Sequence, residues 1–84
     1  MNYIAEINVM PLSDLLDPAG KAVLGGLEKL GITSATDVRI GKHIQLKISS
    51  PSESQAMEIA RDAVKKLLAN PVMEQADIRI VQAS

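Results

Sequence analysis

Length, composition and charge restrict what this chain can be. Its 84 residues suffice for one small domain, and 46% hydrophobic with 23% charged residues argue against disorder. A net charge of −1 and a single aromatic residue, Tyr3, argue against a nucleic-acid binder, which normally has a basic surplus and rings that stack on bases. We therefore expect one domain, residues 1–84, with an aliphatic core.

The chain shows no targeting or membrane signal. Its start lacks the basic and apolar regions of a signal peptide, and no apolar run approaches the roughly 20 residues that span a bilayer. It also has no cysteine, which fits a reducing compartment. These features predict a cytoplasmic protein.

The first part of the chain predicts a strand followed by a helix. Residues 3–10 alternate between apolar and polar side chains, the pattern of a half-buried strand. Asp17 and Pro18 are typical of a helix start, because the carboxylate caps free N–H groups and proline needs no partner there. Gly31 supplies a left-handed stop. Gly26 lies on the apolar side of this helix and would allow close approach to a sheet.

The second part predicts a hairpin, a helix and a strand. Residues 36–40 and 43–49 alternate, and a tight turn at 41–42 would join them. Ser52, spaced from Gln55 as in a capping box, predicts the start of a helix that runs to about Ala69, and residues 76–82 form a last strand. The order βαββαβ predicts an α+β, ferredoxin-like fold, with a four-stranded antiparallel sheet and two helices on one face.

The second helix carries more apolar surface than one sheet requires. Its apolar residues cover about half of the circumference, whereas a core-facing helix needs little over 100°. The excess buries either against the hairpin and chain end or against another subunit. Three leucines between strand and helix, at positions 12, 15 and 16, favour an oligomer.

The sequence offers no constellation for catalysis. His43 is the single histidine, and a general base would also need an orienting carboxylate and a pocket, so we expect an exposed strand residue. No ligand spacing suits a metal, and no glycine-rich loop suits a phosphate. We therefore predict no catalytic, cofactor-binding or metal-binding residue. The basic residues near the predicted turn are either solvated or dock on an acidic partner.

Three stretches together resemble one family. They are residues 16–23 (LDPAGKAV), 37–42 (DVRIGK) and 66–72 (KLLANPV), and in this order and spacing they are similar to PurS, the small accessory subunit of phosphoribosylformylglycinamidine (FGAM) synthase. The resemblance covers essentially the whole chain. It departs near the end, where relatives usually have an aromatic residue around Ala76 and a more acidic tail.

The resemblance implies a scaffold role in purine biosynthesis. The family's enzyme is an ATP- and glutamine-dependent ligase in which a glutaminase subunit releases ammonia and a small synthetase subunit consumes it. PurS-like proteins form homodimers, homotetramers or other oligomers that join these two partners and support ammonia transfer between them. ATP, ADP, Mg²⁺ and glutamine would bind the partner subunits, and this chain would hold no cofactor and catalyse nothing alone.

The resemblance also gives four partner-contact candidates, namely Asp17, Gly20, Arg39 and Lys42. Local roles compete for some of them, since Asp17 caps a helix. Arg39 is the better candidate, because neither a turn nor the core needs it. An alternative function is an ACT-like regulatory module that binds an amino acid; such modules share the βαββαβ order and often carry a turn that residues 17–20 loosely resemble.

Overall fold

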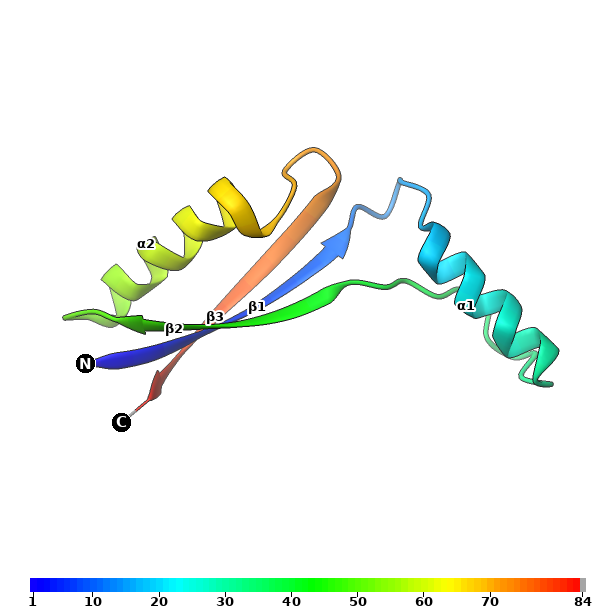
Figure 1. The fold of residues 1–84 in the computed structure, drawn as a ribbon, viewed down its shortest axis with the longest axis horizontal. Helices are drawn as coiled ribbons and strands as arrows, with labels where there is room; N and C mark the ends of the chain where they lie inside the picture. Colours follow the sequence, from blue (N-terminus) through cyan, green and yellow to red (C-terminus); the bar gives the residue numbers. More distant parts are fainter. Residues whose placement is uncertain (84) are drawn as a thin grey trace.

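The computed structural model describes residues 1–83, which form three strands and two α-helices, the second of which continues into a π-helical turn. Figure 1 shows that the strands and the second helix make a body from which the first helix projects. In chain order the elements are β1 (Asn2–Pro11), α1 (Pro18–Lys29), β2 (Lys42–Ser49), α2 (Glu53–Ala63), η1 (Val64–Leu68) and β3 (Glu74–Ala83).

The sheet has the order β2-β1-β3, and both pairings are antiparallel. The predicted alternation in the first strand is confirmed, because every second residue of β1 from Tyr3 to Val9 is buried. These side chains face α2, which presents Ala56 and Ala60 to them. Two alanines let the helix lie close to the sheet. The buried apolar core comprises Tyr3, Ala5, Ile7, Val9, Ile48, Ala56 and Ala60.

The four-stranded sheet predicted from the sequence is wrong. Residues 36–40 are extended but form no strand, and positions 41–42 make no hairpin turn, so the described residues give three strands. The physical reason lies in the hydrogen bonds of this segment. The N–H of Ile40 donates to the Asp17 carboxylate and the Arg39 side chain bonds to the 11–15 linker, so the segment is held against the start of α1.

The predicted position of the first helix is also wrong, although its ends are correct. Asp17 caps α1, Pro18 opens it, and Gly31 has the positive φ of 84° expected of a stop. The helix nevertheless stands away from the sheet instead of covering it (Figure 1). A Cβ at Gly26 would meet no atom within 4 Å, so this glycine serves no close approach to a strand. Only α2, of the two predicted covering helices, lies on the described sheet.

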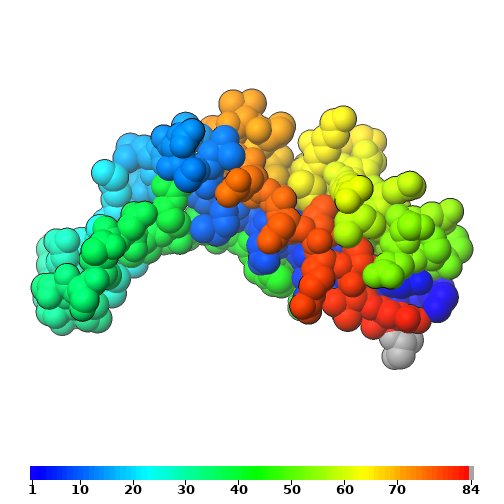
Figure 2. Space-filling model, turned by 180° about the vertical axis from the view of Figure 1, so that it is seen from behind, coloured from blue at the N-terminus to red at the C-terminus, as the bar shows by residue number. Residues whose placement is uncertain are grey.

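We call residues 12–41, which contain α1 and the extended segment that returns from it, the α1 arm. Figure 2 shows the arm, in cyan and green, reaching to one side of the body. The chain measures 51 × 28 × 14 Å, and its radius of gyration is 16.4 Å. A compact chain of this length would have a radius of gyration of about 12 Å. The fold is therefore strongly elongated.

Candidate functional site

The base of the α1 arm is fixed by the carboxylate of Asp17. One carboxylate oxygen accepts from the N–H of Gly20 at 3.0 Å, which caps α1. The other accepts from the N–H of Ile40 at 2.8 Å, on the strand-like segment that returns to β2. One side chain thus caps the outgoing helix and holds the returning segment. Asp17 is 9% exposed, so these bonds are shielded from water.

The hydrogen bonds from Ile40 and then Gly20 lower the pKa of Asp17 below its ordinary value of 3.8, and the nearby Arg39 guanidinium acts in the same direction. Desolvation raises the pKa, but it is a smaller effect than either of these two hydrogen bonds. The carboxylate is accordingly charged at neutral pH. A charged acceptor strengthens both hydrogen bonds at the base of the arm.

The side chain of Arg39 ties the returning segment to the linker that precedes α1. Its Nη1 donates to the carbonyl oxygen of Leu15 at 3.2 Å. Its Nη2 donates to the carbonyl oxygens of Leu12 at 2.6 Å and Pro11 at 3.3 Å. Arg39 therefore has contacts within the fold, outside the core, that the sequence did not predict. We call Asp17 and Arg39, with the backbone groups they bind, the Asp17–Arg39 clasp.

Two glycines permit the close packing around the clasp. A Cβ on Gly20 would overlap the carbonyl oxygen of Val38, and one on Gly41 would overlap the carbonyl oxygen of Val9. Both neighbours are backbone atoms, which cannot move aside as a flexible side chain could. The returning segment can therefore lie directly on the start of α1 and on the end of β1 only because these positions lack a side chain.

A hollow of about 340 Å³ opens beside the clasp. Acidic, basic and apolar side chains line it together, and Leu16 beside them is 68% exposed. A surface with an exposed leucine among charges of both signs suits contact with another protein. The lining residues are Asp14, Leu15, Leu16, Asp17, Lys21, Asp37, Val38 and Arg39.

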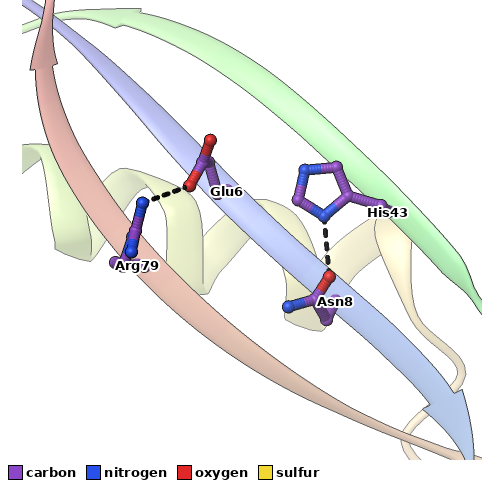
Figure 3. Close-up of polar contacts among 4 residues, drawn as sticks. All are labelled: Glu6, Asn8, His43 and Arg79. Atoms are coloured by element: carbon purple, nitrogen blue, oxygen red, sulfur yellow. Dashed lines mark hydrogen bonds and ion pairs between the residues drawn. The ribbon is translucent and has the colours of Figure 1, made fainter.

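The face of the sheet opposite α2, which we call the open face, carries a polar array in its centre. Arg79 of β3 donates to the carboxylate of Glu6 on β1 at 3.0 Å, and His43 Nδ1 of β2 lies 2.7 Å from Asn8 Oδ1 on β1 (Figure 3). These pairs join all three strands across the face. Because they are exposed, each contributes little to stability.

The structure gathers three of the four predicted partner-contact residues. Asp17, Gly20 and Arg39 meet at the base of the arm, whereas Lys42 opens β2 opposite Val9 and lies outside the hollow. Their contacts with partner proteins stay a prediction. His43 is exposed on a strand, as predicted.

Sequence reasoning missed two features of this site. Lys21 and Asp37 line the hollow, and no spacing in the sequence brings them together. At Gly41 the sequence predicts a hairpin turn, whereas the structure has close packing against the backbone of Val9. The signal that could have found it is weak, because a glycine before a lysine suits a turn and a close backbone contact equally well.

Within residues 1–83, no three histidine, aspartate or glutamate side chains lie where they could hold one metal ion. No helix in the same range is long and apolar enough to cross a membrane.

The structure defines the chain as an elongated α+β domain with a projecting arm and an open sheet face. Comparison with known proteins identifies its family. A sequence model of the PurS family, described as phosphoribosylformylglycinamidine (FGAM) synthase, matches residues 4–82. The chain therefore belongs to the PurS family, which confirms the resemblance found in the sequence.

Individual relatives agree with this assignment. The chain is 41% identical over 73 residues to the phosphoribosylformylglycinamidine synthase subunit PurS of Synechocystis sp., a match that covers 87% of this chain and 73% of the relative. It superposes on Methanocaldococcus jannaschii PurS, a subunit of formylglycinamide ribonucleotide amidotransferase, with a TM-score of 0.87, 28% identity, and coverage of 98% and 99% of the two chains.

A further solved structure is described as PurLQS from Thermotoga maritima. One of its chains matches this chain with a TM-score of 0.88 and 28% identity. The match covers 96% of this chain and 99% of that one. The elongated shape with a projecting helix is thus shared with solved PurS structures over nearly the whole length.

Proposed function

We propose that this chain is a non-catalytic subunit of FGAM synthase that holds a glutaminase subunit and an ATP-dependent synthetase subunit together in the cytoplasm. Membership of the PurS family supports the assignment to this ligase. The observation that carries the scaffold role is the shape. A chain of 83 described residues extends over 51 Å and exposes the arm, the hollow at its base and the open face of the sheet.

The proposed reaction passes ammonia between two active sites, and a scaffold would keep those sites in a fixed position relative to each other. Ammonia released into water at neutral pH becomes protonated and is no longer a nucleophile, so a closed path between the two active sites favours the reaction. A subunit that fixes the relative position of two partners can support such a path without reacting itself. In this proposal ATP, ADP, Mg²⁺ and glutamine bind the partner subunits.

We further propose that the chain acts as a homodimer or homotetramer. A compact chain of 9.0 kDa exposes about 4,900 Å². This chain exposes 5985 Å². The excess of about 1,100 Å² per chain means that a dimer which removed it would bury roughly 2,200 Å², enough for a stable interface.

The distribution of apolar residues supports self-association through the arm. On α1 and just after it, Val23, Leu30 and Ile32 are 43%, 78% and 48% exposed. On the sheet, Ile44 and Leu46 of β2 face the α2 side but are only partly buried. An arm from a second copy that lay over β2 would cover both sets. It would also supply the second helix that a ferredoxin-like sheet has on this face.

Affinity capture from the native lysate tests the proposed function. The tagged chain should bring down a glutaminase and an ATP-dependent synthetase, identified by mass spectrometry, with higher yield when ADP and glutamine are present. If neither partner is recovered under any nucleotide condition, the scaffold function is wrong. A thermal-shift screen with amino acids then decides for or against the ACT-like alternative, which requires stabilisation by a ligand.

A further inference from the structure

The outer edge of β3 is unpaired within the described residues. Its ten residues bond to β1 on one side, and the sheet ends there. Alternate N–H and C=O groups of an antiparallel edge strand point outward and are free to pair with another strand. Proteins often protect such edges with lysine or proline. The β3 sequence EQADIRIVQA has neither, whereas the other edge, β2, carries Lys42 and Lys47.

A groove of about 480 Å³ runs beside this edge, on the side that α2 covers. Figure 2 shows β3, in orange and red, uncovered beside the yellow-green helix. The π-helical turn η1, in which the N–H of Ala69 donates to the carbonyl of Val64 at 3.1 Å, contributes residues to the wall. The apolar lining consists of Met57, Val64, Ala69, Pro71, Ala76 and Ile78.

The groove has free positive charge at its rim. Arg61 and Lys65 line it, both are exposed, and neither forms an ion pair within residues 1–83. The neighbouring Lys66 differs, because it pairs with Asp62 at 2.9 Å. The one acid in the lining, Glu74, already accepts a hydrogen bond from the N–H of Asn70 at 2.8 Å. The groove therefore complements an apolar side chain that has an acidic side chain near it.

We propose that the outer edge of β3 binds an extended, acidic segment of one of the larger FGAM synthase subunits as a fourth strand of the sheet. The inference rests on the proposed function and names one surface through which it operates. The backbone of the segment pairs with β3. A bulky apolar side chain of the segment enters the groove, and an acidic side chain nearby meets Arg61 and Lys65.

The pleat of a strand makes the edge and the groove one site. Side chains alternate between the two faces of a sheet, so a strand added beside β3 places every second side chain on the α2 side. Ala76 lies on that side, opposite Val9 of β1, and its methyl group leaves the space beside it open. A larger residue at position 76 would fill this space with part of the chain itself.

Hydrogen exchange tests the strand pairing directly. The exchange of β3 amides is measured by NMR in the ¹⁵N-labelled chain alone and in the complex with the glutaminase and synthetase subunits of the same organism. The outward-pointing amides of β3 should exchange at least about 100-fold more slowly in the complex, because pairing with a new strand protects them. The amides that already pair with β1 serve as the internal reference.

Matched substitutions test the groove. Ala76→Glu places a negative charge in it that repels an acidic segment, while Gln75→Glu places the same charge on the open face of the same strand. Ala76→Glu should weaken assembly of the complex about tenfold, and Gln75→Glu less than about twofold. Arg61→Glu should weaken assembly similarly, and Lys66→Glu, outside the groove, should have little effect. Circular dichroism and thermal melting establish that each variant is folded.

Three outcomes overturn the proposal. The inference alone is wrong if wild-type chain assembles with the partners but the outward amides of β3 exchange as before. It is equally wrong if those amides are protected in the isolated chain at concentrations where it self-associates, because a second copy is then the occupant. If the wild-type chain does not assemble with either subunit at all, the inference and the proposed function both fall.

Discussion

The guanidinium of Arg39 donates hydrogen bonds to three backbone carbonyl oxygens, those of Pro11, Leu12 and Leu15. Hydrogen bonds from a charged group contribute more than neutral ones. Arg39→Ala should therefore reduce the free energy of unfolding by about 2 kcal/mol, and Arg39→Lys, which cannot form the same fork, should recover only part of this.

Urea denaturation followed by circular dichroism measures this effect, with Arg61→Ala as the control. Arg61 is exposed on α2, so its substitution should change stability by less than about 0.5 kcal/mol. An unchanged midpoint for Arg39→Ala would show that the guanidinium does not hold the arm, and Arg39 would then serve only a partner. If Arg39→Ala lowers both stability and assembly, Arg39 holds the arm in the shape that assembly requires.

The lowered pKa of Asp17 predicts that the folded chain loses stability when this carboxylate is protonated in acid. Its pKa is lowered in the folded chain, so the carboxylate stabilises the fold fully above the unfolded value of 3.8. That stabilisation is lost as the pH falls from there through the lower folded pKa. Asp17→Asn should have a lower melting temperature than wild type at pH 7, and the difference should shrink below about pH 3.8.

Thermal melts between pH 7 and pH 2 check this behaviour. Asp14→Asn, which alters an exposed carboxylate three residues earlier in the linker, is the matched control and should melt like wild type throughout. Parallel pH profiles for wild type and Asp17→Asn would contradict the assignment of charged hydrogen bonds to Asp17.

Gly20 illustrates how local packing and a predicted contact role can compete for one residue. Gly20→Ala places a methyl group against the carbonyl oxygen of Val38, so the returning segment must shift. We expect a loss of about 1–3 kcal/mol in the free energy of unfolding. Gly25→Ala is the control, because a Cβ there meets no atom within 4 Å and alanine favours the helix.

At the scale of elements, α1 exposes apolar residues on the side that its own chain does not cover, with Val23 on the helix and Leu30 directly after it. Val23→Ser with Leu30→Ser should leave the fold of the isolated chain intact, because both side chains are exposed. The double variant should raise the dissociation constant for self-association at least about tenfold. Sedimentation velocity over a concentration series measures this, and unchanged association would show that the arm is not the dimer interface.

The sequence predicts where helices and strands begin and end better than it predicts which of them pack or pair together. The strand at the N-terminus, the caps of α1 at Asp17 and Gly31, and the Ser52 cap of α2 all rest on local chemistry, and all are confirmed. The strand at 36–40 failed because its alternation is compatible with a strand that has no partner. Whether an extended segment joins a sheet depends on its long-range hydrogen bonds. Here the N–H of Ile40 donates to Asp17, and the Arg39 side chain donates to the linker before α1, so the segment is held away from the sheet.

The candidate site shows the same limit. Only the family resemblance points to the residues at the base of the arm, and the hydrogen bond that joins Asp17 to Ile40 spans 23 positions in the chain. No periodicity links residues so far apart. The groove beside β3 was not predicted at all, because it depends on how η1 and the loop after it return to the sheet.

At the scale of the whole molecule, elongation is the property that needs explanation. A chain of this size gains stability by burying its own apolar surface, yet this one leaves apolar residues of the arm exposed and one face of the sheet open. Such a shape is stable only if contacts with other chains bury the apolar surface that it exposes. In our proposal, self-association through the arm and attachment of partners at the remaining surfaces together cover the exposed apolar residues.

The central claim is that this chain joins two catalytic partners without catalysing the reaction. The measurement that tests it most directly is FGAM synthesis by the glutaminase and synthetase subunits of the same organism, titrated with this chain. With glutamine as nitrogen donor, the rate should rise with added chain and saturate at a fixed stoichiometry. With high ammonia in place of glutamine, the synthetase should work without the chain. A glutamine-dependent rate that does not respond to the chain would contradict the account.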